Sequence, residues 1–181
     1  MQAAHACLSP AERQRAQRLR FERHRRRFIV ARARLRQLLA ERLGVKPDAI
    51  EIAYGSNGKP KLPHRGLHFN VAHCDDVALF AFSHASEIGV DIEAIRPIRE
   101  ADAIAAQFFS PRENQAYAAA APRDKPLAFL RCWTRKEALV KALGAGLLMP
   151  LEKFDIAHAP SWRLHSFFPL PGFIAALACH G

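Results

Sequence analysis

The chain has 181 residues, half of them hydrophobic, and its formal net charge is +10 at pH 7. This length suits one domain, or two small halves that share a core. No segment approaches the roughly 20 apolar residues that a membrane-spanning helix requires, so we expect no membrane association. The cysteines lack zinc-site spacing, and we interpret them as free thiols in a reducing compartment. We therefore expect a cytoplasmic monomer with four free cysteines: Cys7, Cys74, Cys132 and Cys179.

The first half of the chain predicts one long helix followed by strands. Residues 10–43 have a helical apolar stripe, with Pro10 near the start and Gly44 after the end. A Gly/Pro/Asn-rich stretch over residues 55–66 indicates a loop. Period-two patterns predict strands over 49–54, 67–72, 76–83 and 87–93, with a turn at residues 75–76.

The second half begins after a linker over residues 94–100, which contains Pro97. Helical patterns follow, and the longest of them ends at Gly144. We expect helices over 101–109, 111–119 and 125–143, and strands near 152–157, 161–168 and 172–179.

Acidic residues alternate with β-branched residues in the segment Gly89-Val90-Asp91-Ile92-Glu93. On a strand, residues i and i+2 lie on the same face. Asp91 and Glu93 would then lie side by side, with Val90 and Ile92 buried behind them. Two neighbouring carboxylates repel each other unless a cation lies between them. Because Mg²⁺ prefers oxygen ligands and often binds carboxylates together with substrate phosphates, the pattern predicts a magnesium site.

The helix predicted over residues 125–143 adds a third carboxylate and a lysine. Glu137 and Lys141 are four residues apart, so they share one helix face. Glu137 can then reach the metal while Lys141 reaches a phosphate on the same metal. An exposed salt bridge between these two residues is a simpler alternative. A capping box between Thr134 and Glu137 is a weaker one, because the apolar pattern begins earlier and places Glu137 in mid-helix.

Two motifs together resemble those of the 4′-phosphopantetheinyl transferases, most closely the larger, surfactin-synthetase-activating type. They are Gly-Val-Asp-Ile-Glu at residues 89–93 and Trp-x-x-Lys-Glu-Ala-x-x-Lys-x-x-Gly at residues 133–144. Further segments match in the family's order, and the resemblance covers roughly residues 15–150. These segments are Asn57-Gly58-Lys59-Pro60, Phe69-Asn70-Val71-Ala72-His73-Cys74 and Phe109-Ser110-Pro111-Arg112-Glu113.

The chain departs from the family pattern at three points. Ala72 replaces the usual serine, and Cys74 stands where serine or threonine is frequent. Residues 1–10 do not supply the N-terminal strand that members of this type usually carry. Either the chain is a trimmed variant, or the true start lies upstream.

The resemblance implies an α+β fold of two pseudo-symmetric halves, residues 1–93 and 94–181. Each half is a small, mostly antiparallel sheet packed on a long helix, with the active site in the cleft between them. The implied reaction moves the 4′-phosphopantetheine arm of coenzyme A to a serine of an apo-acyl or peptidyl carrier protein. It depends on Mg²⁺, with Mn²⁺ as an alternative, and releases adenosine 3′,5′-bisphosphate.

The resemblance also implies roles for individual residues. Asp91, Glu93 and Glu137 hold the metal, and the candidate general base is Glu137 or a metal-bound water beside it. Lys141 neutralises charge on the leaving phosphate, and Glu113 is an alternative ligand or base.

Candidate coenzyme A contacts come from four segments. His73 would meet the 3′-phosphate, although a structural role is the more common one for a lone histidine. Lys59 would meet the nucleotide end, through its side chain or through the backbone of its loop. Arg20 and Arg27, from the arginine-rich helix, and Lys136 complete the set.

Three other functions remain open at this point. The positive charge suits a nucleic-acid-binding module, although three carboxylates gathered at one point would repel phosphates. The same carboxylates suit a different Mg²⁺-dependent phosphotransferase or a nuclease. Ala72 suits a catalytically weakened transferase paralogue.

Overall fold

The computed structural model describes residues 1–63, 66–146, 149–156, 159 and 161–181. The chain forms two compact units, Met1–Ile52 and Ala53–Gly181, each of which is described by itself. The two halves predicted from the sequence, residues 1–93 and 94–181, are defined by an expected internal symmetry and not by compactness. They stay a prediction. No helix in the described part of the chain combines the length and the apolar character that a membrane crossing needs.

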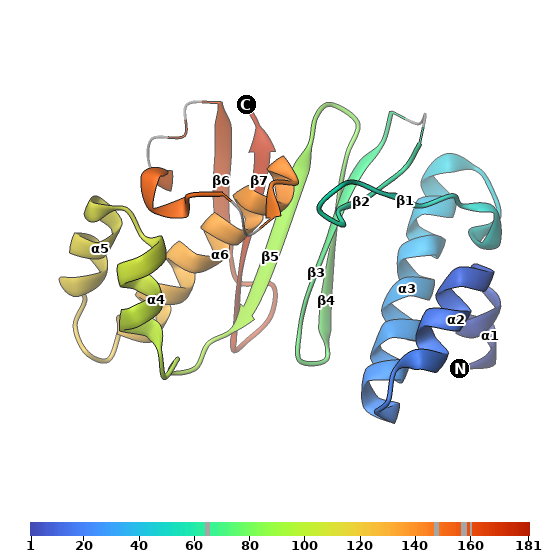
Figure 1. Cartoon of the computed structure of the whole chain (residues 1–181), viewed down its shortest axis with the longest axis horizontal. Helices are drawn as coiled ribbons and strands as arrows, with labels where there is room; N and C mark the ends of the chain where they lie inside the picture. Colours follow the sequence, from blue (N-terminus) through green and yellow to red (C-terminus); the bar gives the residue numbers. More distant parts are fainter. Residues whose placement is uncertain (64–65, 147–148, 157–158, 160) are drawn as a thin grey trace. The chain divides into compact units, whose positions relative to one another are not determined.

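The first unit is helical, and its long helix is interrupted. It contains α1 (Gln2–Ala6), α2 (Pro10–Arg18), α3 (Glu22–Leu43) and the 3-10 turn η1 (Pro47–Ala49), with α2 and α3 as separate helices (Figure 1). The prediction of one helix over residues 10–43 is wrong, because the backbone is extended at Leu19 and at Phe21. The helical stripe continues across this break, so periodicity could not reveal it. The predicted strand over residues 49–54 shortens to β1 (Ala53–Tyr54), which belongs to the second unit.

A buried ion pair joins α2 to α3. Glu12 is 6% exposed and accepts a hydrogen bond of 2.6 Å from Nε of Arg36, which is 2% exposed. The Arg36 guanidinium also donates to the backbone carbonyls of Pro47 and Ile50. Arg32 lies 3.4 Å from the other oxygen of Glu12. At least these two arginines of the arginine-rich helix therefore serve the fold of the first unit.

The second unit is built on antiparallel strands, and it confirms the predicted α+β class. β1 pairs with β2 (Pro60–Lys61), and β3 (His68–Cys74) pairs with β4 (Val77–Ser83). The turn between β3 and β4 contains Asp75 in a left-handed conformation. A three-stranded sheet has the order β5-β7-β6, formed by β5 (Ile88–Ala94), β7 (Phe173–His180) and β6 (Trp162–Phe167).

Three helices and a 3-10 turn complete this unit: α4 (Ala101–Phe108), α5 (Pro111–Ala118), α6 (Lys125–Leu143) and η3 (Leu151–Lys153). The bounds predicted for the last long helix are confirmed, and Gly144 ends it with a φ of 65°. The predicted strand near residues 152–157 is wrong in its described part, where the 3-10 turn replaces it. Residues 157 and 158 lie outside the described part.

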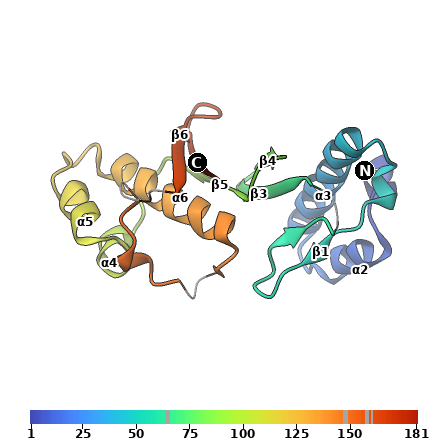
Figure 2. The ribbon, with the colours of Figure 1, turned by 90° about the horizontal axis from the view of Figure 1, so that it is seen from above.

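Helix α6 lies on the three-stranded sheet (Figures 1 and 2) and approaches β5 very closely. A Cβ built on Gly89 would be 1.9 Å from the carbonyl oxygen of Ala138 and 2.4 Å from the backbone nitrogen of Ala142. The neighbouring strand offers Ala176 and Ala178 to the same helix face. Small residues therefore let the helix backbone touch the strand at this point.

The variant Gly89→Ala should destabilise the protein by at least about 2 kcal/mol, since overpacked cores lose stability in this range. The added methyl group would overlap backbone atoms, which cannot move aside as a side chain does. Urea denaturation of both proteins measures the loss. Gly55→Ala is the matched control, because its Cβ would come no closer than 3.7 Å to another heavy atom. Equal stability of the two variants would contradict the close packing.

Candidate active site

Two carboxylates project from β5 on the strand face that meets α6. Asp91 and Glu93 follow Gly89 at spacing i+2 and i+4, so the alternation of a strand places all three on one side. Val90 and Ile92 are buried on the other side, in an apolar cluster with Ala72, as the sequence predicted. Asp91 is itself only 5% exposed. The strand therefore holds a charged group largely out of solvent.

Helix α6 brings Glu137 and Lys141 to the same place. The Lys141 ammonium lies 2.5 Å from Oδ1 of Asp91. Burial and the charge of Asp91 raise the pKa of Glu137, and Glu93 adds to that rise, although Lys141 opposes it. Glu137 thus lies within electrostatic reach of both strand carboxylates. The ion pair that the structure describes for Lys141 is with Asp91 on β5, rather than the alternative salt bridge with Glu137 along the helix.

The strand carboxylates are similarly affected. Burial raises the pKa of Asp91, and Lys141 only partly offsets this effect. Burial and the neighbouring charge of Asp91 raise the pKa of Glu93. Asp91 raises the pKa of both Glu93 and Glu137, and Glu93 also raises that of Glu137, so the three carboxylates form one acidic cluster, which we define as Asp91, Glu93 and Glu137.

The acidic cluster has the donor chemistry of a hard divalent cation. Within the part of the chain that the structure describes, Oδ2 of Asp91 has no hydrogen-bond partner although it is buried, and such an orphaned oxygen is costly unless a ligand or a cation satisfies it. A cation would also relieve the repulsion among the carboxylates. Among the described residues, no three His, Cys, Asp or Glu side chains are already arranged around a common metal position. The donor set therefore fits Mg²⁺, but the side chains must adjust to bind it.

Side chains of β3 accept hydrogen bonds from backbone amides on the edge of β5 that does not pair with β7. The Val90 amide donates to Oδ1 of Asn70 at 3.0 Å, and the Ala94 amide donates to Sγ of Cys74 at 3.3 Å. The Cys74 thiol in turn donates to Oε2 of Glu93, with 3.6 Å between sulfur and oxygen. Sequence reasoning missed Asn70 and treated Cys74 only as a departure from a pattern. The polar residues at alternate positions of this strand were the available signal.

His73 lies on the same strand and is exposed. Its charge lowers the proton affinity of Asp91, although burial of Asp91 dominates and leaves that pKa raised. The histidine is therefore close enough to influence the acidic cluster electrostatically. Its predicted contact with the 3′-phosphate stays a prediction.

Lys136 and Glu113 lie away from the acidic cluster and contact each other. Lys136 is fully buried and donates to the carbonyls of Leu151 and Phe154, each at 2.7 Å. Its ammonium also lies 2.7 Å from Oε2 of Glu113. One residue along a helix turns a side chain by about 100°, which takes Lys136 away from Glu137. With all three ammonium donors used within the described part of the chain, Lys136 has a structural role, and its predicted contact with coenzyme A stays a prediction.

Glu113 is equally committed to the fold. Its carboxylate accepts hydrogen bonds from the backbone amides of Ser110 and Ile156, the first of which forms a capping box at the start of α5. Because Lys136 balances its charge, Glu113 has little capacity left for a metal or a proton. Its predicted role as an alternative ligand or base stays a prediction that these contacts do not support.

The remaining predicted contacts divide between the two units. Lys59 belongs to the second unit, where its ammonium bonds the Glu87 carboxylate and the carbonyl of Ala142. Arg20 and Arg27 belong to the first unit, and the Arg20 guanidinium lies over the Phe21 ring at 5.6 Å. Their contacts with coenzyme A stay predictions.

Comparison with known proteins decides the family. A family model described as the 4′-phosphopantetheinyl transferase superfamily matches residues 87–176, and one described as 4′-phosphopantetheinyl transferase, N-terminal, matches residues 1–85. The chain is 38% identical to the 4′-phosphopantetheinyl transferase HetI of Nostoc sp. over 97% of its own length and 80% of that protein. The chain belongs to the 4′-phosphopantetheinyl transferase superfamily.

Other relatives match less of their own length. The chain is similar to 4′-phosphopantetheinyl transferase Sfp of Bacillus subtilis, with 28% identity over 87% of the chain and 67% of that protein. It is 42% identical to 4′-phosphopantetheinyl transferase AcpT of Escherichia coli K12, over 60% of the chain and 55% of that protein. The match to the superfamily model spans both β5 and α6, the elements that carry the acidic cluster.

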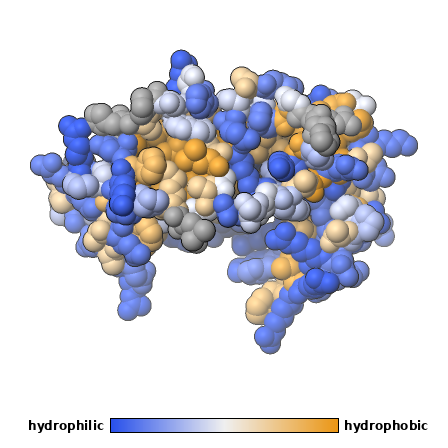
Figure 3. Space-filling model, turned by 45° about the horizontal axis from the view of Figure 1, so that its top comes forward, coloured by the Kyte–Doolittle hydropathy of each residue, from blue (hydrophilic) through white to orange (hydrophobic). Residues whose placement is uncertain are grey.

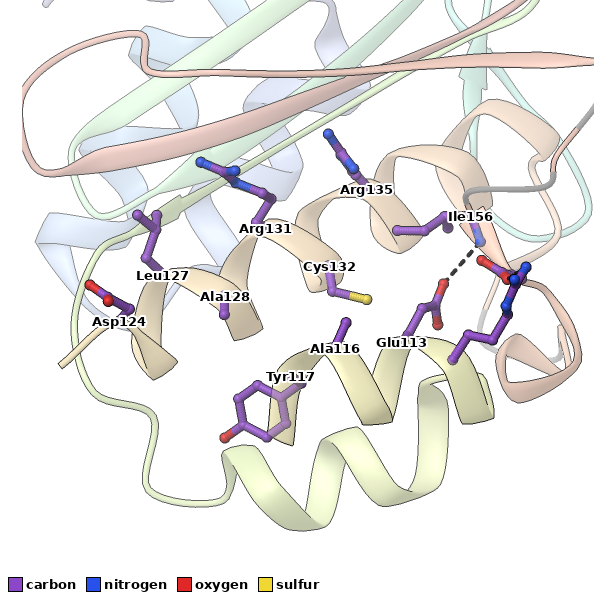
Figure 4. A pocket seen from close by; sticks show the side chains of 12 residues that line it. Glu113, Ala116, Tyr117, Asp124, Leu127, Ala128, Arg131, Cys132, Arg135 and Ile156 are labelled. Carbon is purple, nitrogen blue, oxygen red and sulfur yellow. Dashed lines mark hydrogen bonds and ion pairs between the residues drawn. The ribbon is translucent and has the colours of Figure 1, made fainter. Parts of the chain in front are cut away.

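This member of the superfamily also has a cavity of about 660 Å³ between α5, α6 and Ile156. Figure 4 shows Glu113 and Cys132 pointing into the space between the two helices. Arg135 lines the cavity, and Glu137 follows it by two residues, or about 200° around the helix. The cavity therefore opens on a different face of α6 from the acidic cluster.

The buried pair of Lys136 and Glu113 can be tested by a double-mutant cycle. Lys136→Met and Glu113→Gln should each cost about 3–5 kcal/mol, because each leaves an uncompensated buried charge or an unsatisfied partner. Glutamine preserves a capping box, so the loss reports the charge. The double variant should be more stable than the sum of the two losses implies. Urea denaturation gives all four free energies of unfolding.

Arg123→Met is the control for this cycle, since the Arg123–Asp124 pair is exposed and should contribute little. Additive losses from Lys136→Met and Glu113→Gln would show that the two groups do not interact. That result would leave the Lys136 ammonium available for a contact with coenzyme A.

Proposed function

We propose that the protein transfers the 4′-phosphopantetheine arm of coenzyme A to a serine of an apo-carrier protein. The proposed reaction depends on Mg²⁺ and releases adenosine 3′,5′-bisphosphate. One observation carries it: a superfamily member gathers Asp91, Glu93 and Glu137 around Lys141, with an orphaned oxygen on Asp91. The relatives named above carry the same activity in their names, which supports the assignment.

The chain's own residues supply specific functions in this proposal. Asp91, Glu93 and Glu137 would hold the metal, which when bound contributes positive charge at the reacting phosphates. Lys141 would turn from Asp91 to the phosphate oxygens, since its ammonium is partly exposed. This movement would place a cation where negative charge develops.

Glu137 is also the proposed general base. The Glu137 carboxylate lies within electrostatic reach of Asp91 and Lys141, and a general base must lie close to the proton that it takes. The serine proton would pass to the Glu137 carboxylate as the serine oxygen bonds the β-phosphorus. The bond between that phosphorus and its bridging oxygen would break, and its electrons would leave with the bisphosphate.

Two features bear on the competing functions. Ala72 is 3% exposed and packs with Val90 and Ile92, so the missing serine hydroxyl would lie against an apolar cluster. This position weakens the case for an impaired paralogue. Figure 3 shows hydrophilic residues over much of one face. Together with the net charge of +10, that surface suits anionic partners such as coenzyme A and an acidic carrier.

Incubation with coenzyme A, Mg²⁺ and a panel of apo-carriers should add one phosphopantetheine mass to the carrier serine. EDTA should abolish the gain, because the acidic cluster repels phosphates without a cation. Intact-mass spectrometry reads both results, and carriers with serine replaced by alanine are the control. If the folded protein modified none of the acyl or peptidyl carriers in the panel, the proposal would be contradicted.

Asp91→Ala and Glu137→Ala should differ in how they respond to metal. Asp91→Ala should weaken metal binding, so excess Mg²⁺ or Mn²⁺ should restore part of the rate. Glu137→Ala removes a ligand and also the base, and a positioned base is worth roughly 10²–10⁴-fold. Added metal should therefore not rescue it. The measurement is the transfer rate as a function of metal concentration.

Melting curves provide the control for this pair. Neither variant should lose stability without metal, since each removes one charge from a self-repelling group. Full rescue of Glu137→Ala by metal would exclude it as the base. A large loss of melting temperature in Asp91→Ala would instead make Asp91 a structural residue.

A further inference from the structure

The turn that contains Asn57 and Lys59 binds the C-terminal end of α6. Nδ2 of Asn57 donates to the carbonyls of Gly144 and Ala145 at 2.9 and 3.2 Å. Nζ of Lys59 donates to the carbonyl of Ala142 at 2.6 Å. Carbonyls at a helix end lack partners within the helix, and a cation is favoured there by the helix dipole. Two side chains distant in sequence thus cap this end.

Lys59 also reaches the start of β5. Its ammonium pairs with Glu87, which directly precedes that strand, and the other oxygen of Glu87 lies 3.0 Å from Nδ1 of His68. Burial raises the pKa of Glu87, but Lys59 and His68 outweigh this effect and leave it below the ordinary value. Glu87 is therefore an ionised partner for Lys59.

These contacts connect the two elements that carry the acidic cluster. Asp91 and Glu93 lie on β5 beyond Glu87, while Glu137 and Lys141 lie on α6 before Ala142. The side chain of Lys59 is only 17% exposed. Its hydrocarbon stem passes close to the end of α6, since a Cβ built on Gly144 would lie 3.3 Å from Cδ of Lys59.

We infer that Lys59 is a positioning residue, which together with Glu87 holds the end of α6 against the start of β5 and so sets the distance between Lys141 and Asp91. This inference rests on the proposed transferase function. It assigns the Lys59 ammonium to the protein's own carbonyl and carboxylate groups, in place of the nucleotide contact expected from the sequence.

The steady-state kinetics of Lys59→Met and Glu87→Gln separate positioning from phosphate binding. Both variants should lower kcat, by between about tenfold and a hundredfold, because small misplacements of reacting groups are costly. The KM for coenzyme A should change by less than about twofold, since no uniform binding contact is lost. The double variant should be no slower than the slower single variant. Lys61→Met, an exposed lysine two residues away, is the matched control.

A lysine that bound phosphate would give the opposite pattern. Lys59→Met would raise the KM for coenzyme A at unchanged kcat. Glu87→Gln would lower that KM, because it removes a repelling carboxylate and releases the ammonium. Either result overturns the inference.

Amide hydrogen exchange tests the same contact without any substrate. Residues 137–145 should exchange faster in Lys59→Met and in Glu87→Gln than in the wild type or Lys61→Met. Asn57→Ala should have a similar effect, since it frees the carbonyls of Gly144 and Ala145 without changing a charge. Unchanged exchange in all three variants would overturn the inference. If the wild type transferred nothing, the proposed function would fail while exchange still reported on the contact.

Discussion

The close approach of α6 to β5 at Gly89 is the constraint on which the rest of the second unit depends. Only a residue without a Cβ leaves room for the backbone of Ala138 and Ala142. Alanines on α6 and β7 extend the same close packing. Because strand side chains alternate, the glycine face is also the face of Asp91 and Glu93. The packing that excludes a side chain at residue 89 therefore brings the helix to the carboxylates that follow it.

The Lys136–Glu113 and Lys141–Asp91 pairs of helix α6 differ in how fully they are satisfied. Lys136 and Glu113 are buried, and their polar atoms have partners in backbone amides and carbonyls as well as in each other. Asp91 has Lys141 on one oxygen and nothing on the other. Since buried polar groups usually find partners, the unsatisfied pair supports our proposal that this face of α6 is the reactive one, and the satisfied pair stabilises the helix from the other side.

The unsatisfied pair also explains the raised pKa values of the cluster. Desolvation opposes charge on all three carboxylates, and the charge of Asp91 adds to this effect at Glu93 and Glu137. Such an arrangement lowers the stability of the ionised protein without a cation. A binding site can tolerate this loss of stability, because a bound cation removes the repulsion and its binding is more favourable for that reason.

Local sequence patterns correctly predicted those features of the fold that depend on residues close together in the sequence. The bounds of α6, the pairing of strands around residues 75–76 and the burial of Val90 and Ile92 all follow from periodicity and turn chemistry. The interruption at Leu19 did not, because it is a change of backbone conformation within a continuous helical pattern.

The site was predicted less evenly. Neighbouring residues in the motif gave no sign that Lys136 turns inward while Glu137 faces the strand, because that depends on where α5 packs. The partners of Lys59, in β5 and α6, are distant in sequence and appear only in the folded chain. The spacing of residues in the sequence identified the acidic residues, whereas the packing of the helices determines which lysine lies beside them.

A crystal structure of the protein with coenzyme A and Mg²⁺ tests the central claim most directly. The account predicts one Mg²⁺ with oxygens of Asp91, Glu93 and Glu137 at about 2.0–2.1 Å, together with pyrophosphate oxygens. Lys141 should have turned from Asp91 to a phosphate, while α6 stays in contact with Gly89. A metal bound away from these carboxylates, with the Lys141–Asp91 pair unchanged, would contradict the account.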